Sequence, residues 1–189
     1  MVKKLSLGAI TLAFALMMPS GASAQLTYGV STGMSIPQGD FGNSQTTGYN
    51  VGAEAFYTLP HLKGIGVGGN VAFNMFKGKE LSDGGFIVKY ENITACAILP
   101  SIRYLFPLEK NSSFGLYAQV GVGLNALDGV ADAAGIIKTE TDLAWALGVG
   151  VTYKLNDKIT LLASPNYNSI SAAASWNYFS VNAGIVFGK

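Results

Sequence analysis

Few residues in the sequence could do chemistry, and they lie far apart. The chain has one histidine, His61, and one cysteine, Cys96. A Ser-His-acid triad needs a histidine within hydrogen-bond reach of a serine, and zinc sites need clusters of histidine and cysteine. One residue of each kind meets neither condition. The sequence therefore predicts no catalytic residue, no metal site and no intramolecular disulfide, and the protein is not expected to be an enzyme.

A glycine-rich segment, Gly64–Gly69, matches the G-x-G-x-x-G pattern literally. The dinucleotide fingerprint requires these glycines to close a strand and open a helix, but here more strand-like sequence follows. No cofactor is predicted. The formal net charge of +1 also gives no support for a nucleic-acid partner, which would need a basic patch.

Three charged residues, Glu54, Arg103 and Lys154, fall inside strand-like segments among small and polar neighbours. Charges removed from water must be paired and hydrogen-bonded. Our hypothesis is that Glu54 pairs with Arg103 or Lys154 and that they join Gln119 and Tyr117 in a polar cluster inside a barrel. Eight strands leave an interior just wide enough to be filled by side chains, so this cluster would help to plug it. A narrow wet cavity is the alternative, because many inward positions are glycine.

The elements that must position these residues are strands. After residue 25 the dominant pattern is alternation of apolar with small or polar residues, interrupted by turn residues. The pattern predicts strands at about 26–37, 48–59, 64–76, 89–106, 114–126, 141–155, 158–168 and 176–187. The fold class is all-β, a single closed antiparallel up-and-down barrel of about eight strands.

Three features favour a transmembrane barrel over a soluble lipocalin-like barrel or a sandwich. The apolar faces contain no charged residue, as expected where hydrocarbon meets the wall. The strands are long enough to cross a bilayer at a tilt. The predicted connections alternate between long polar segments (38–47, 77–88 and 127–140) and mostly short ones (60–63, 107–113 and 156–157), which is typical of outer-membrane barrels.

The first 24 residues have the pattern of a signal peptide. Lys3 and Lys4 precede an apolar stretch from Leu5 to Met18, and Ala22-Ser23-Ala24 is an A-x-A cleavage site. The predicted domains are residues 1–24, a signal peptide for Sec export, and 25–189, the barrel. The composition agrees, with 12% charged residues and 24 glycines.

Aromatic residues gather near the predicted strand ends, where amphipathic rings suit the headgroup level of a bilayer. The predicted girdle comprises Tyr28, Tyr49, Tyr57, Phe73, Tyr104, Phe106, Tyr153, Tyr167 and Phe187.

Several of these segments resemble a known family, the small eight-stranded outer-membrane barrels that include the OmpA barrel domain and OmpX-like porin-family proteins. The matching segments are Gly29–Phe41, Pro100–Phe106, Tyr117–Gly123 and Gly148–Tyr153. The resemblance implies localisation in the bacterial outer membrane, with lipid and lipopolysaccharide around the wall. It also implies recognition of the last strand by the barrel-assembly machinery through Phe187, although Gly188 and Lys189 follow here.

The sequence leaves the function less defined than the fold. The leading expectation is a non-enzymatic barrel with a structural or surface-interaction role and a plugged lumen. One alternative is a narrow porin or an OmpW-like conduit for small hydrophobic molecules, for which Phe56 and Phe76 are the candidate apolar lumenal residues near the outer end. The other is adhesion to a host surface through the outer loops, whose protein partner the sequence does not name.

Overall fold

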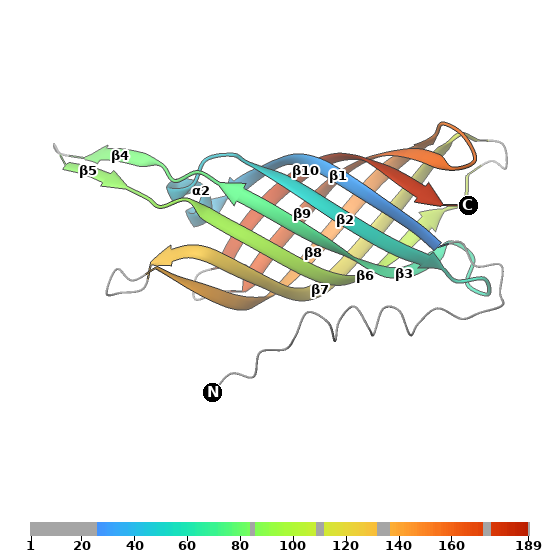
Figure 1. Cartoon of the computed structure of the whole chain (residues 1–189), viewed down its shortest axis with the longest axis horizontal. Helices are drawn as coiled ribbons and strands as arrows, with labels where there is room; N and C mark the ends of the chain where they lie inside the picture. Colours follow the sequence, from blue (N-terminus) through green and yellow to red (C-terminus); the bar gives the residue numbers. More distant parts are fainter. Residues whose placement is uncertain (1–25, 84–85, 109–111, 132–136, 172–174, 189) are drawn as a thin grey trace.

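The computed structural model shows a closed eight-stranded barrel (Figure 1). It describes residues 26–188 apart from 84–85, 109–111, 132–136 and 172–174, so the predicted signal peptide lies outside the described residues. The barrel strands are β1 (Leu26–Gln38), β2 (Gly48–Thr58), β3 (Ile65–Phe76), β6 (Ile93–Phe106), β7 (Phe114–Ala131), β8 (Ile137–Lys154), β9 (Ile159–Ser171) and β10 (Ser175–Gly188). A helix, α2 (Gly39–Ser44), and a hairpin of β4 (Glu80–Asp83) and β5 (Phe86–Lys89) complete the elements.

Neighbouring strands are antiparallel throughout, and β1 closes the barrel by pairing with β10. Val30 lies opposite Ile185 across this seam, and opposite Ala53 of β2 on the other side. Closure leaves the wall without a free edge, which satisfies the backbone groups of a structure that lipid surrounds. The predicted fold class is therefore confirmed.

The two ends of the barrel differ. We call the end that carries the start of β1, the end of β10 and the connections 59–64, 107–113 and 155–158 the turn end, and the opposite end the loop end. At the loop end, α2 follows β1, and the β4–β5 hairpin projects beyond the barrel (Figure 1). Two of the long segments predicted as irregular polar loops therefore contain regular structure.

The prediction of a long connection at 127–140 is wrong over most of its length, because the two flanking strands continue into it. β7 and β8 each span 18 residues and stay paired beyond Leu127, through Val130 opposite Lys138. The register shifts between Leu127 and Val130, where Gly129 has a φ of 94° that favours glycine. A pair of strands can continue beyond the membrane through polar residues. The polar composition of 127–140 therefore indicates exposure to water, but it does not show where the strands end.

The barrel has an apolar outer surface and a mixed interior. Val120, Val122 and Leu124 of β7 are exposed, whereas Tyr117, Gly121 and Asn125 on the same strand are buried. The predicted assignment of faces is therefore right. Among the described residues, no helix is long and apolar enough to cross a membrane.

Candidate functional site: the barrel lumen

A charged cluster lies in the turn-end half of the lumen. Arg103 of β6 donates two hydrogen bonds to Glu54 of β2, of 3.0 Å to Oε1 and 2.7 Å to Oε2. Its Nε and Nη2 also donate to Gln119 Oε1, at 3.1 Å and 2.7 Å. The bidentate geometry makes this the strong form of a carboxylate–guanidinium pair. Only 6% of Arg103 is exposed, so the pair spans the interior away from bulk water.

Two aromatic rings sandwich the guanidinium. The Arg103 Cζ lies 3.8 Å from the centroid of Phe56 and 4.2 Å from that of Tyr117, distances at which the ring quadrupole attracts a cation. The Tyr117 side chain also lies close to that of Ser164 on β9, two strands away around the barrel. A Cβ on Gly150 would overlap the Tyr117 ring, so the ring needs glycine at this position of β8.

Lys154 does not belong to the lumenal cluster, which corrects one predicted member. Its Nζ lies 2.9 Å from Asp157 Oδ1, and more than half of its side chain is exposed. Lys154 is the last residue of β8, where a side chain on the inward face of the pleat already extends into solvent. The alternation correctly predicted that Lys154 lies on the inward face of the strand. It gave no information on how far along the barrel axis the residue lies.

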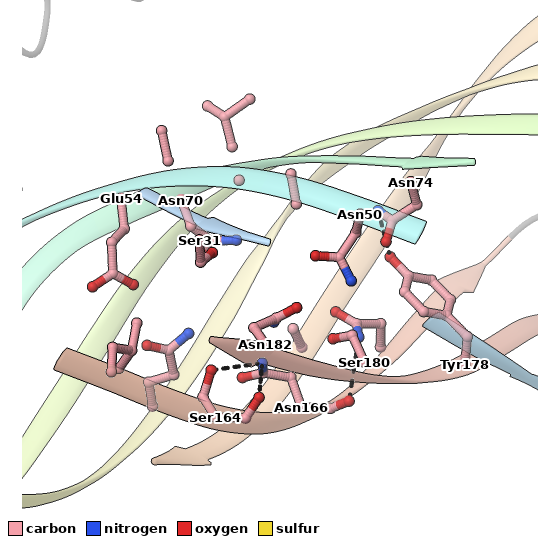
Figure 2. A pocket seen from close by; sticks show the side chains of 18 of the residues that line it. Ser31, Asn50, Glu54, Asn70, Asn74, Ser164, Asn166, Tyr178, Ser180 and Asn182 are labelled. Carbon is pink, nitrogen blue, oxygen red and sulfur yellow. Dashed lines mark hydrogen bonds between the residues drawn. The ribbon is translucent and has the colours of Figure 1, made fainter. Parts of the chain in front are cut away.

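A small polar chamber lies on the loop-end side of the charged cluster. It has a volume of about 50 Å³ and is lined by amide and hydroxyl side chains from six strands, including Ser31, Asn70, Ser164, Asn166 and Asn182. Figure 2 shows these groups pointing toward one another across the interior. A water needs about 10–15 Å³ of such volume and two to four polar partners. The chamber can therefore hold a few waters, and the buried Asn182 Oδ1, which has no protein partner among the described residues, is one group they would satisfy.

A hydrogen-bonded network forms the loop-end wall of the chamber. Asn50 donates to the Ser35 hydroxyl at 3.0 Å, and that hydroxyl donates to Asn74 Oδ1 at 2.8 Å. Asn74 in turn donates to the Tyr178 hydroxyl at 3.3 Å. The chain of bonds links β1, β2, β3 and β10, and its members Ser35, Asn74 and Tyr178 are almost completely buried.

An aromatic stack lies beyond this network and covers the loop end. Phe41 of α2 stacks on Trp176 of β10, with centroids 4.9 Å apart and planes inclined at 14°. Phe41 also meets Phe76 edge to face, and Phe76 meets Tyr178 in the same way. The Lys79 ammonium donates to the carbonyl of Gly42, which ties α2 to the segment after β3. We call Phe41, Phe76, Trp176 and Tyr178 the aromatic plug.

The rest of the loop-end interior is mainly apolar. The buried residues there come mainly from β6, β7, β8 and β9, and they include Ile93, Ala95, Ala97, Leu127, Ala144 and Ile170. Asn125 lies among them, 1% exposed, with neither amide atom hydrogen-bonded within the described residues. The alternation indicated that the inward faces are small and polar. At the loop end this is wrong, because large apolar side chains also point inward.

Of the two predicted lumenal phenylalanines, Phe76 lies at the loop end, whereas Phe56 lies at the turn end beside Arg103. Sequence reasoning missed Phe41, Trp176 and Tyr178. Trp176 and Tyr178 have even numbers, like the polar residues that form the inward face of the last strand. This alternation is the signal that could have identified them as lumenal. Phe41 had no such signal, because it lies on a helix where a loop was expected.

The predicted girdle residues fall into two groups on the barrel. Tyr28, Tyr57, Tyr104, Phe106, Tyr153 and Phe187 lie toward the turn end, and Tyr49, Phe73 and Tyr167 lie in the loop-end half. Further rings accompany them. Phe114 packs against Tyr153, and Trp145 and Phe179 both contact Tyr167.

The residues with reactive side chains are not part of the lumen. His61 is exposed on the turn between β2 and β3, and Cys96 is half-buried on β6 opposite Phe73. Among the described residues, no three or more histidine, cysteine, aspartate or glutamate side chains are grouped so that they could hold a metal ion.

The comparisons with known proteins agree with this architecture. The structure of Neisserial surface protein A aligns with a TM-score of 0.62 at 17% identity, covering 88% of this chain and 99% of that one. OprG from Pseudomonas aeruginosa aligns at 0.60 and 16% identity, covering 89% and 96%. The N-terminal barrel of Pseudomonas aeruginosa OprF aligns at 0.51 and 12% identity, covering 86% and 97%. At such identities the likeness concerns the fold.

Sequence comparison adds the family. No curated protein matches the chain significantly, but the profile of the outer membrane protein beta-barrel domain matches residues 7–187. A closed eight-stranded barrel with an apolar outer wall is the structure such a domain requires. The chain therefore belongs to the outer membrane protein β-barrel family.

Proposed function

We propose that the protein is a non-enzymatic outer-membrane barrel with a lumen closed by its own side chains and a structural or surface-interaction role. The observation that carries this proposal is that two clusters of packed side chains lie inside the barrel. The Glu54–Arg103–Gln119 cluster lies in the turn-end half, and the aromatic plug covers the loop end. Only about 50 Å³ of polar chamber separates them, which suits a few waters but no hydrated solute.

Planar-bilayer recording tests the closed lumen. Purified, refolded protein is expected to give no steady conductance steps, whereas an open porin handled identically gives them. A heat-dependent mobility shift on a denaturing gel checks that the protein used was folded. Steady steps from folded wild-type protein would contradict the closure.

The surface-interaction part of the proposal rests on the β4–β5 hairpin. It projects beyond the loop end (Figure 1) and exposes Leu81, Ile87 and Val88. Apolar side chains held away from the membrane suit contact with another protein. Replacement of residues 80–89 by a short Gly-Ser linker is expected to leave the barrel folded and to reduce attachment of producing cells to a partner surface. Unchanged attachment would count against a role for the hairpin.

A conduit for small hydrophobic molecules is the second candidate, favoured by the apolar loop-end interior. Trp176 lies in the aromatic plug, and the chain has one other tryptophan, Trp145, on the outer wall. In a W145F variant, saturable quenching of the remaining tryptophan by a small aromatic alcohol would support entry of ligand at the plug. A linear, unsaturable response is expected if the loop end is closed.

We also propose that residues 1–24 are a cleaved Sec signal and that the assembly machinery recognises the last strand through Phe187. The Phe187 ring lies on the wall and stacks on Tyr28 across the barrel seam, with centroids 5.7 Å apart. Sequencing of the mature N-terminus is expected to start at Gln25. An F187A variant is expected to accumulate less in the outer membrane while refolding normally in detergent.

A further inference from the structure

An apolar groove lies in the outer wall, and Tyr117 and Ser164 line both this groove and the lumenal chamber. It has a volume of about 410 Å³ and crosses β6 to β10. Its bottom consists of Gly150, Ala163 and Pro165, which are small or lack a long side chain. Its rims are larger outward-facing residues, namely Phe106, Leu116, Val149, Val151 and Val181. For scale, an engineered cavity of about 150 Å³ in another protein binds benzene.

The local backbone explains why the wall is hollowed here. Proline has no N–H to give to a ladder, and Pro165 interrupts the pairing of β8 with β9. The ladder pairs Gly148 with Asn166 and resumes at Val151 opposite Ala163, with no pairs between. Because Gly150 has no side chain, the buried ring of Tyr117 packs against its backbone from the lumen side and contributes to the lining of the groove. The groove is therefore a built feature of these two strands rather than a chance gap between side chains.

The groove lies in the turn-end half of the wall. Phe106 is the last residue of β6, and Leu116 lies beside the start of β7. The rings of Phe114 and Tyr153 pack together at the same end, with centroids 4.9 Å apart. Exposed lysines follow directly, Lys154 at the end of β8 and Lys158 in the turn to β9. An apolar groove, an aromatic edge and basic side chains thus follow one another toward the turn end.

We propose that this groove binds one acyl chain of a membrane phospholipid and that Lys158 faces its phosphate. The turn end of an outer-membrane barrel faces the periplasm, so the adjacent lipids are phospholipids. Hydrocarbon surrounds the wall, so burial of apolar surface does not drive binding. The affinity comes instead from van der Waals contact with a groove shaped for the chain and from the attraction of lysine for phosphate. The proposal rests on membrane residence and is independent of whether the lumen conducts.

The proposal is tested with a variant in which a large side chain fills the groove. An A163F variant places a ring at its bottom, and A53F makes the same change on an exposed outward-facing alanine of β2, on the opposite side of the barrel. Delipidated protein in a mild detergent is titrated with phosphatidylglycerol, and native mass spectrometry measures the fraction that carries one lipid. The dissociation constant of A163F is expected to rise at least tenfold, and that of A53F to stay within twofold of wild type. Heat-dependent gel mobility checks that each variant is folded.

Further measurements test the phosphate contact and the acyl-chain site separately. A K158A variant is expected to bind phosphatidylglycerol several-fold more weakly while its binding of uncharged diacylglycerol is unchanged, and K154A, which removes the lysine paired with Asp157, is expected to bind both lipids like wild type. Equal binding of phosphatidylglycerol to A163F and wild type, or an equal loss in A163F and A53F, would overturn the acyl-chain site. A wild-type dimer that A163F abolishes would show that a second copy of the chain occupies the groove, and would also overturn the proposal.

Discussion

At the scale of single residues, burial distinguishes two ion pairs of the same chemical type, Arg103–Glu54 and Lys154–Asp157. The Arg103 and Glu54 side chains are 7% and 14% exposed, whereas those of Lys154 and Asp157 are 55% and 92% exposed. A buried charge without its partner is costly, but an exposed pair contributes little. The same residue types therefore have different energetic roles.

We accordingly predict that E54A lowers the free energy of unfolding by about 3 kcal/mol, because it leaves the Arg103 guanidinium buried with Gln119 as its remaining hydrogen-bond acceptor. K154A, which removes an exposed lysine, is expected to cause no measurable change. Urea-induced unfolding of protein inserted in phospholipid vesicles measures both. An E54A variant as stable as wild type would show that the lumenal pair is not needed to hold the turn-end half of the barrel.

At the scale of elements, the loop end includes a short helix that contacts with neighbouring segments hold in place. α2 has six residues, too few to be stable alone. It is placed by the Phe41 ring, which packs on Trp176 and Phe76, and by hydrogen bonds that Lys79 donates to the carbonyls of Gly42 and Ser44. Tertiary contact, and not helix propensity, fixes this element.

F41A is therefore predicted to release α2 from the barrel without unfolding the wall. Limited proteolysis of folded protein is expected to cleave within 39–47 at least several-fold faster in F41A than in wild type, while the heat-dependent gel shift remains. D40A, which changes an exposed neighbour on the same helix, is the matched control and should be cleaved at the wild-type rate. Equal cleavage of F41A and D40A would contradict the anchoring role of the ring.

At the scale of the whole molecule, the two ends of the barrel carry different structures and are expected to face different compartments. The helix, the hairpin and the extended β7–β8 ribbon are all at the loop end, opposite the C-terminal end of β10 (Figure 1). In outer-membrane barrels the longer connections are external and the short turns periplasmic. We therefore expect the loop end to face the outside of the cell.

This orientation gives a prediction for intact cells. An epitope inserted between residues 84 and 85, in the hairpin, is expected to be labelled by antibody on unbroken cells. The same epitope inserted after His61, in the exposed turn between β2 and β3, should be labelled only after the cells are opened. Reversed labelling would mean that the barrel is inserted the other way round.

The sequence by itself determined the wall of this protein. Period-two alternation is a local property of each strand, so the strands, their outward faces and the inward position of Glu54, Arg103, Gln119 and Tyr117 could be predicted from it. Only the tertiary structure decided what lies along the lumen. Depth and register are set by pairing between distant strands, and these bring Glu54 to Arg103, place Lys154 at the rim and bring Phe41 to Trp176. The groove at Pro165 likewise required the positions of five strands at once.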